Sequence, residues 1–155
     1  HYQVVESGFK YNMTDMQAAL GIHQLARVKK NWLKREAIWK IYFSRLKHLP
    51  LGLPEAAKPS DRHAYHLFPI RIDASKAGIT RDNFLNEMAA RRIGVGVHYL
   101  SIPEHPFYQK EFGWKPEDFP EAMAFGRETV SLPLSAKLMD DDVEDVILAI
   151  EDILS

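Results

Sequence analysis

The stretch GFKYNMTDMQAALG, residues 8–21, decides the fold because it joins a glycine-led loop to the start of a helix. Thr14 and Gln17 have the capping-box spacing, in which each side chain bonds the backbone of the other residue. Asp15 follows at the positive end of the helix dipole, where a carboxylate is favourable. The sequence therefore predicts a helix that begins directly after Thr14, with small and apolar residues continuing it.

The loop before this helix carries Lys10, Tyr11 and Asn12. A cation and amide donors beside a helix N-terminus favour an anion such as phosphate. Lysine and asparagine are also ordinary loop residues, so the same pattern fits a loop without any ligand. The residues alone leave both interpretations open.

The helical pattern continues to His48, and residues 27–30 are a candidate for a break. Residues 27–47 hold eight basic side chains against the single acid Glu36. A basic, aromatic helix is compatible with nucleic-acid or membrane binding, but large aromatics at helical spacing are typical of a core and lysines around them of a solvated face. We therefore expect one apolar stripe to pack inward, made of Val28, Trp32, Trp39, Tyr42 and Leu46.

Shorter elements follow this helix. Residues 49–60 contain three prolines and a glycine, which exclude a continuing helix. The alternation in residues 63–73 predicts a strand, and Pro69 within it indicates an edge or a bulge. The face expected to be shared consists of His66, Phe68, Ile70 and Ile72.

The remaining pattern alternates helices with short extended pieces. Thr80 is a good N-cap for an amphipathic helix over residues 81–92, with Phe84, Leu85 and Met88 inward. A helix over residues 121–130, the extended piece SLPL and a last helix from Asp140 complete the chain. The last helix should turn its apolar side inward, namely Val143, Val146, Ile147, Ile150, Ile153 and Leu154. This order predicts an α+β fold with one small sheet covered by helices.

Residues 94–99 form the second predicted strand, with Gly94, Gly96 and His98 on one face. Glycines in a strand often mark the close approach of another backbone or a ligand, so His98 either points into a site or packs in an ordinary way. A long loop follows, with four prolines and a helix of one to two turns around residues 105–112. Loops of this length tend to be functional.

Composition narrows the class of protein. The 155 residues have the size of one domain, and 46% hydrophobic with 26% charged residues is typical of a soluble globular protein. The sequence has no cysteine, no long apolar run and no leader-like segment, so we expect a cytoplasmic protein. A net charge of −1 gives no general attraction to nucleic acid or anionic lipid.

The common motifs of nucleotide-binding, zinc-protease and serine-hydrolase sites do not occur, and the seven histidines form no metal-ligand pattern. The first residue is His1 rather than methionine, and the opening YQVVESGF is already strand-like. We therefore expect this chain to be cut from a longer protein.

Six blocks in one order carry a family resemblance: GFKYNMTDMQAALGIHQL, HAYHLFPIRID, GITRDNF, RRIGVGVHYLSIPEHPFYQKEFGW, DFPEAMAFGRETVSLPL and DDDVEDVILAI. Together they resemble the C-terminal part of the DegT/DnrJ/StrS aminotransferases over essentially the whole chain. These are pyridoxal 5'-phosphate enzymes that act mainly on nucleotide-linked keto-sugars, usually with glutamate as amino donor. The opening block and the GxHY segment most resemble enzymes that aminate a UDP-linked 4-keto-pentose or 4-keto-hexose.

The resemblance implies the small C-terminal domain of an aspartate-aminotransferase-like fold, in a homodimer with active sites at the subunit interface. Residues 1–48 would be the interface loop and the helix that links to a large cofactor domain, and residues 49–155 the small domain. Asn12 or Lys10 would reach the cofactor phosphate of the neighbouring subunit; many relatives have asparagine where Lys10 stands. His98 and Tyr99 would line the sugar-nucleotide pocket, with His105 close by.

The same resemblance places the catalytic lysine upstream. Transamination needs a lysine that holds the cofactor as a Schiff base and moves a proton. None of the eleven lysines here lies in a corresponding motif, so we expect no catalytic residue in this chain and no activity or bound cofactor in it alone. Two other hypotheses are a free-standing dimerisation domain without cofactor, and nucleic-acid binding through residues 27–47 with a steep dependence on salt.

Overall fold

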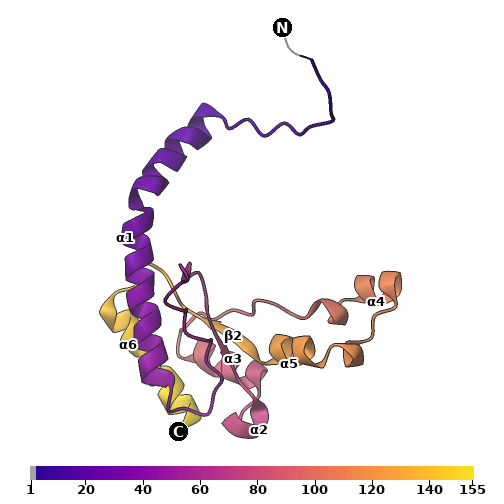
Figure 1. Cartoon of the computed structure of the whole chain (residues 1–155). Coiled ribbons are helices and arrows are strands. Elements are labelled where there is room, and N and C mark those ends of the chain that lie inside the picture. The colour runs from indigo at the N-terminus through magenta and orange to yellow at the C-terminus, as the bar shows by residue number, and fades with distance from the viewer. Residues whose placement is uncertain (1–2) are drawn as a thin grey trace.

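The computed structural model describes residues 3–155 and shows a long helix, α1 (Asp15–Leu46), beside a small α+β body (Figure 1). The N-terminal segment leads away from the body, and residues 3–9 have no regular structure, so the strand-like opening was wrong for them. Tyr2, the first residue of that opening, lies outside the described residues. No helix in residues 3–155 has the length and apolar character of a membrane span.

Helix α1 begins where the capping pattern predicts. The Thr14 backbone N–H donates to Gln17 Oε1 over 2.9 Å, and the Gln17 N–H donates to Thr14 Oγ1 over 3.3 Å, so the capping box is confirmed. The expected break at residues 27–30 is wrong, because α1 runs without interruption for 32 residues. The sequence there is RVKK, in which arginine and lysine are good helix formers and no glycine or proline intervenes.

The C-terminal half of α1 supplies one wall of the core. Trp39, Tyr42 and Leu46 are buried as predicted, and Ile38 joins them. Val28 is 53% exposed, so its predicted place in the stripe is wrong. The body covers α1 only along its second half, and the first half projects beyond it (Figure 1). The Tyr42 hydroxyl donates to the Pro133 carbonyl over 2.9 Å, and burial raises its pKa.

The sheet has two antiparallel strands, β1 (Phe68–Arg71) and β2 (Thr129–Leu132). Phe68 pairs with Leu132 and Ile70 with Val130, so these four side chains share the core face of the sheet. Phe68, Ile70 and Ile72, three of the four residues predicted to share one face, are all buried.

The expectation for His66 is wrong, because this side chain is exposed. The strand begins only at Phe68, and Tyr65 has a positive φ of 47° that interrupts the extended alternation before it. The predicted strand thus keeps only its second half.

The predicted strand over residues 94–99 is also wrong. Gly96 alone pairs with Ser131 of β2: the Gly96 N–H donates to the Ser131 carbonyl over 3.1 Å, and the Ser131 N–H donates back over 2.7 Å. The chain then leaves the sheet, because a bridge of one residue pair is not continued on either side.

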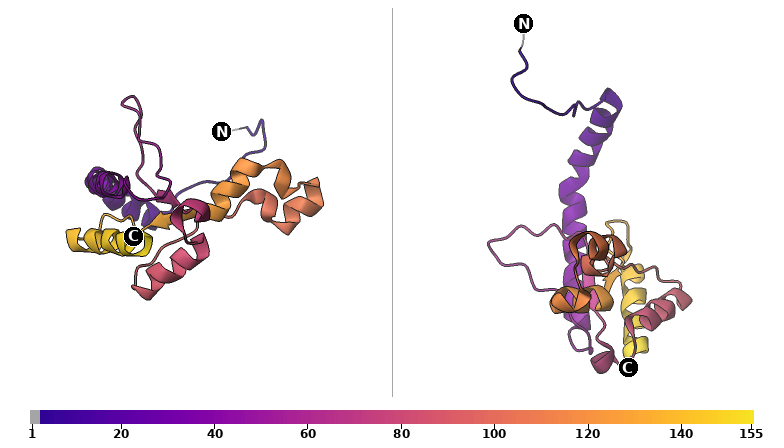
Figure 2. Two further views of the ribbon diagram at one scale, coloured as in Figure 1. Left: turned by 90° about the horizontal axis from the view of Figure 1, so that it is seen from below. Right: turned by 90° about the vertical axis from the view of Figure 1, so that its right-hand side faces the viewer.

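Helices α1, α3 and α6 share one hydrophobic core with the sheet. Phe84 and Met88 of α3 and the predicted apolar side of α6 are buried or partly buried. Ion pairs Lys34–Asp140 and Arg45–Glu144, both 2.9 Å, join α1 to α6, and the two helices lie side by side in both figures. The short helices α4 and α5 extend to the side away from α1 (Figure 2).

The remaining elements are α2 (Ala74–Ala77), α3 (Arg81–Ala90), η1 (Ile102–Glu104), α4 (Pro106–Phe112), η2 (Pro116–Asp118), α5 (Pro120–Glu128) and α6 (Asp140–Leu154).

The caps of these helices agree with the sequence. Thr80 Oγ1 accepts from the Asn83 N–H over 3.3 Å at the start of α3, and α6 begins at Asp140 as predicted. The helix predicted over residues 121–130 ends at Glu128, since Thr129 and Val130 belong to β2. The predicted α+β fold with one small, helix-covered sheet is confirmed.

Candidate functional site

Lys10 and Asn12 lie on the extended segment that precedes α1. Both residues are exposed, and this segment points away from the α+β body (Figure 1). Its neighbouring aromatic rings, Phe9 and Tyr11, stack on each other with centroids 5.4 Å apart but are 84% and 83% exposed. Within one chain, the structure therefore does not bring these two residues to the predicted sugar-binding residues.

His98 lies beside the bridge between Gly96 and β2. Its ring occupies the space above Gly96, where an added Cβ would stand 2.8 Å from His98 Cε1. Paired residues of an antiparallel bridge place their side chains on the same face, so the ring lies on the Ser131 side of β2. His98 is half-buried, and its Nδ1 atom is buried without a hydrogen-bond partner among the described residues.

Two hydroxyl groups share this face of β2. Thr129 and Ser131 alternate with the core-facing Val130, and their Oγ atoms are buried without partners in the described part of the chain. Buried polar groups normally have a partner, so unpaired groups identify a place where a ligand or water completes the network. Glycine at position 96 is what leaves room for the imidazole here.

Gly96→Ala is expected to displace the His98 ring and to lower the free energy of unfolding by about 1 kcal/mol, because the new methyl group meets the imidazole. Gly94→Ala is the matched control, since a Cβ at position 94 meets nothing within 4 Å. NMR of the His98 ring protons, with their contact to Tyr99, measures the displacement. Equal ring spectra for the two variants would contradict it.

Tyr99 and His105 are exposed residues at the two ends of one stretch. Tyr99 is 73% exposed, and its ring meets that of His98 edge-on with centroids 4.9 Å apart. His105 is exposed and caps the start of α4. Between them, the buried Ser101 hydroxyl donates to the Ala122 carbonyl of α5, which fixes the stretch to that helix.

The predicted sugar-binding residues therefore lie on one continuous segment that is supported by β2 and α5. The loop after His105 is ordered by aromatic stacking, with ring centroids of Tyr108 and Trp114 5.8 Å apart. Gln109 Nε2 donates to the Pro103 carbonyl over 2.8 Å, and Arg127 pairs with Glu104 at 2.9 Å. The arrangement offers imidazole and phenol groups on one open surface.

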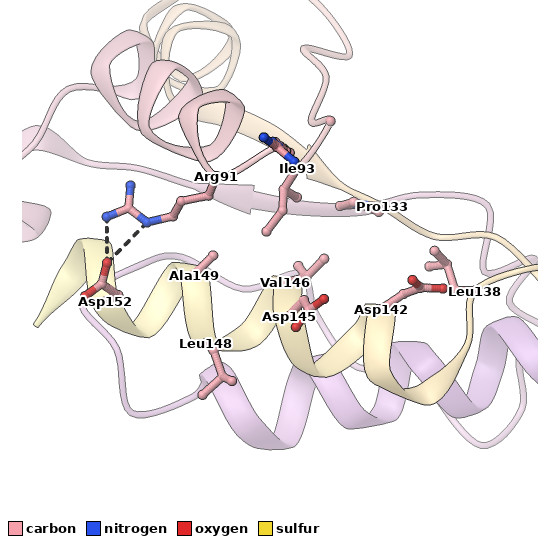
Figure 3. A pocket seen from close by; sticks show the side chains of 12 residues that line it. Arg91, Ile93, Pro133, Leu138, Asp142, Asp145, Val146, Leu148, Ala149 and Asp152 are labelled. Carbon is pink, nitrogen blue, oxygen red and sulfur yellow. Dashed lines mark hydrogen bonds and ion pairs between the residues drawn. The ribbon is translucent and has the colours of Figure 1, made fainter.

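A groove of about 840 Å³ lies elsewhere, between the end of α3 and α6 (Figure 3). None of the predicted site residues lines it. Arg91 on its rim is neutralised by Asp152 at 2.6 Å and by Glu87 at 2.6 Å, and the floor contains Val146 and Ala149. The charge of Arg91 is therefore already paired within the chain.

The lysine side chains of the described residues are exposed or partly buried. A Schiff-base lysine works from a desolvated position or beside another cation, whereas no lysine in residues 3–155 is buried. Lys34, Lys40 and Lys76 form ion pairs with carboxylates at 2.9, 2.9 and 3.0 Å. No group of three potential metal ligands occurs in the described part.

Comparison with known proteins identifies the family. The model of the DegT/DnrJ/EryC1/StrS aminotransferase family matches residues 1–151. Two curated relatives are each 41% identical over 155 residues: the uncharacterized protein MJ1066 of Methanocaldococcus jannaschii, matched over 100% of this chain, and the spore coat polysaccharide biosynthesis protein SpsC of Bacillus subtilis, matched over 99%. The chain spans 40% of the length of each.

Solved structures agree with this assignment. The putative sugar aminotransferase Spr1654 of Streptococcus pneumoniae, in its apo-form, is 28% identical with a TM-score of 0.85, over 99% of this chain and 38% of that one. Its PLP-form gives a TM-score of 0.83 over 100% and 40%. The fold is therefore the predicted aspartate-aminotransferase-like small domain with its long N-terminal helix. The chain belongs to the DegT/DnrJ/EryC1/StrS aminotransferase family.

Proposed function

We propose that this chain is the C-terminal part of a pyridoxal-phosphate enzyme that transfers an amino group from glutamate to a nucleotide-linked keto-sugar. The match of the family model to residues 1–151 carries this proposal. The names of SpsC and Spr1654, which refer to polysaccharide biosynthesis and to a sugar aminotransferase, support a sugar as acceptor. We place the parent enzyme in the cytoplasm, where nucleotide sugars are made.

The exposed half of α1 supports a shared active site. Met16, Leu20 and Leu25 are 80%, 66% and 73% exposed, and this density of apolar surface on a projecting helix is typical of a face that another protein surface covers. We propose that residues 1–48 link to the cofactor domain and meet a second subunit, while residues 49–155 form the small domain. Lys10 or Asn12 then donates to the cofactor phosphate of the neighbouring subunit.

In this proposal His98, Tyr99 and His105 bind and orient the sugar nucleotide. The half-buried imidazole of His98 supports a polar contact to a sugar hydroxyl, and the exposed ring of Tyr99 supports stacking on a sugar or base. Pyridoxal phosphate supplies the electron sink for the amino transfer. The role of this chain is to hold the acceptor in reach and to exclude water around it.

We also propose that the Schiff-base lysine lies outside these 155 residues and that the chain alone is inactive. Incubation with pyridoxal phosphate followed by borohydride reduction and peptide mass spectrometry tests this. We expect no stable adduct on any lysine of the chain alone, and one adduct, on a lysine outside residues 1–155, in the full-length protein. An adduct of defined position in the chain alone would contradict the proposal.

The exposed half of α1 also fits a second candidate, a free-standing dimerisation domain without cofactor. The gene sequence that encodes the residues before His1 distinguishes the two candidates. A lysine-bearing cofactor domain there supports the aminotransferase, and its absence supports the interaction domain.

A further inference from the structure

Helix α1 carries more positive charge than α6 neutralises. Three of its basic side chains have carboxylate partners: Lys34 with Asp140, Lys40 with Glu36, and Arg45 with Glu144. Lys29 and Arg35 have no ion pair among the described residues, and both border a cavity of about 290 Å³ between α1 and the loop before β1.

One wall of this cavity is a single face of α1. Val28, Trp32 and Arg35 follow one another at steps of four and three residues, so they lie above one another on the helix. The opposite wall consists of Arg62, His63 and Ala64. Three cationic side chains and a histidine therefore surround the space, and none of the described acidic residues lines it.

The two walls are held together by specific contacts. The Trp32 indole N–H donates to the His63 carbonyl over 2.7 Å, and the Arg62 guanidinium lies 5.7 Å from the centre of the Trp32 ring. His63 Nδ1 accepts from the Tyr65 backbone N–H over 3.1 Å, so the neutral imidazole carries its proton on Nε2. The loop is thus fixed with its donors beside α1.

Arg35 provides an independent indication of a ligand. Its Nε atom is buried and has no hydrogen-bond partner in the part of the chain that the structure describes. A buried guanidinium N–H without an acceptor is costly, and an anion removes that cost. Arginine is also the side chain best suited to bind phosphate oxygens in pairs.

We propose that this cavity binds the phosphate or diphosphate group of a small molecule through Arg35 and Arg62, with Lys29 adding charge. The inference goes beyond the proposed function, since none of these residues is among those assigned there to cofactor or sugar. Nucleic acid also contains phosphate groups. The test must therefore distinguish a small anion bound in the cavity from a polyanion bound along the basic side chains of α1.

NMR titration of the chain with inorganic diphosphate at constant ionic strength, with a chelator present, tests the proposal. The Trp32 indole N–H and the Arg35 Nε–H are the reporters. We expect saturable shifts of both signals, and a loss of affinity of about tenfold or more in Arg62→Gln and in Arg35→Gln. Arg62 is exposed, so Arg62→Gln should fold and still tests the proposal if Arg35→Gln does not fold.

Lys47→Gln is the matched control, because it removes the same charge from an exposed position after α1, outside the cavity. Its affinity is expected to change by less than about twofold, as salt screens a distant surface charge. Shifts that do not saturate, or an equal loss in the control, would overturn the proposal. So would an oligonucleotide that binds more tightly than diphosphate and loses affinity in Lys47→Gln.

Discussion

Phe68→Ala is expected to lower the free energy of unfolding of this chain by about 3–5 kcal/mol, the usual cost of truncating a buried aromatic residue. Phe68 is fully buried in β1, and its ring meets Trp39 and Tyr42 of α1 edge-on, with centroids 5.0 and 5.3 Å apart. It therefore joins the sheet to the helix. Since domains of this size have about 5–15 kcal/mol of stability in total, the variant is close to unfolding.

Urea denaturation followed by circular dichroism measures this effect. Phe125→Ala is the control, because Phe125 is 43% exposed on α5 and its truncation should change the stability by less than about 1 kcal/mol. A loss below about 1 kcal/mol for Phe68→Ala would show that α1 and the sheet do not share one core.

The fold was predictable where local signals and burial agree. The capping box at Thr14, the N-cap at Thr80 and the apolar side of the last helix all appear in the structure. These features depend on neighbouring residues in the chain. The sequence shows such spacing directly, and no tertiary contact overrides it.

The predictions that proved wrong concern residues whose surroundings depend on the tertiary structure. Val28 has the spacing of a core residue, but α1 extends past the body at that point, so its exposure depends on surfaces that the helical period does not describe. Alternation around Gly96 suggested a full strand, yet only one residue pair bridges to β2. His66 follows the alternation of β1, but it lies between Tyr65, which has a positive φ, and Phe68, where the strand begins. The residues that pack against or pair with a segment lie elsewhere in the chain, so the local pattern of that segment does not predict them.

Only part of the candidate site could be predicted from the sequence. Of the two glycines taken to indicate a close approach, only Gly96 has one, by the His98 imidazole, whereas a Cβ at Gly94 would meet nothing within 4 Å. The cavity at Arg35 and Arg62 was missed, because it joins residues 27 positions apart through the bond from Trp32 to His63. The one signal for it was the excess of basic residues over acidic ones in α1.

Mixing two impaired variants of the full-length enzyme is expected to restore activity, if Lys10 or Asn12 serves the site of the neighbouring subunit. One variant carries Lys10→Ala and Asn12→Ala, and the other lacks the upstream Schiff-base lysine. Removing the phosphate donors should lower kcat/KM by about tenfold or more, since charged hydrogen bonds to phosphate are strong. Removing the lysine should abolish turnover.

The expected recovery follows from the arithmetic of a twofold dimer. When the two variants exchange subunits freely, half of the dimers are mixed, and each of these has one site with an intact lysine and an intact partner loop. About one quarter of the sites should therefore be active. If the loop instead serves its own subunit, every site in the mixture lacks either the lysine or the loop. The activity would then stay at the level of the separate variants, and the proposal of a shared site would be wrong. A mixture of the Lys47→Ala variant with the lysine variant serves as the reference for the recovered activity. The Lys47→Ala subunit should contribute an intact site in any pairing.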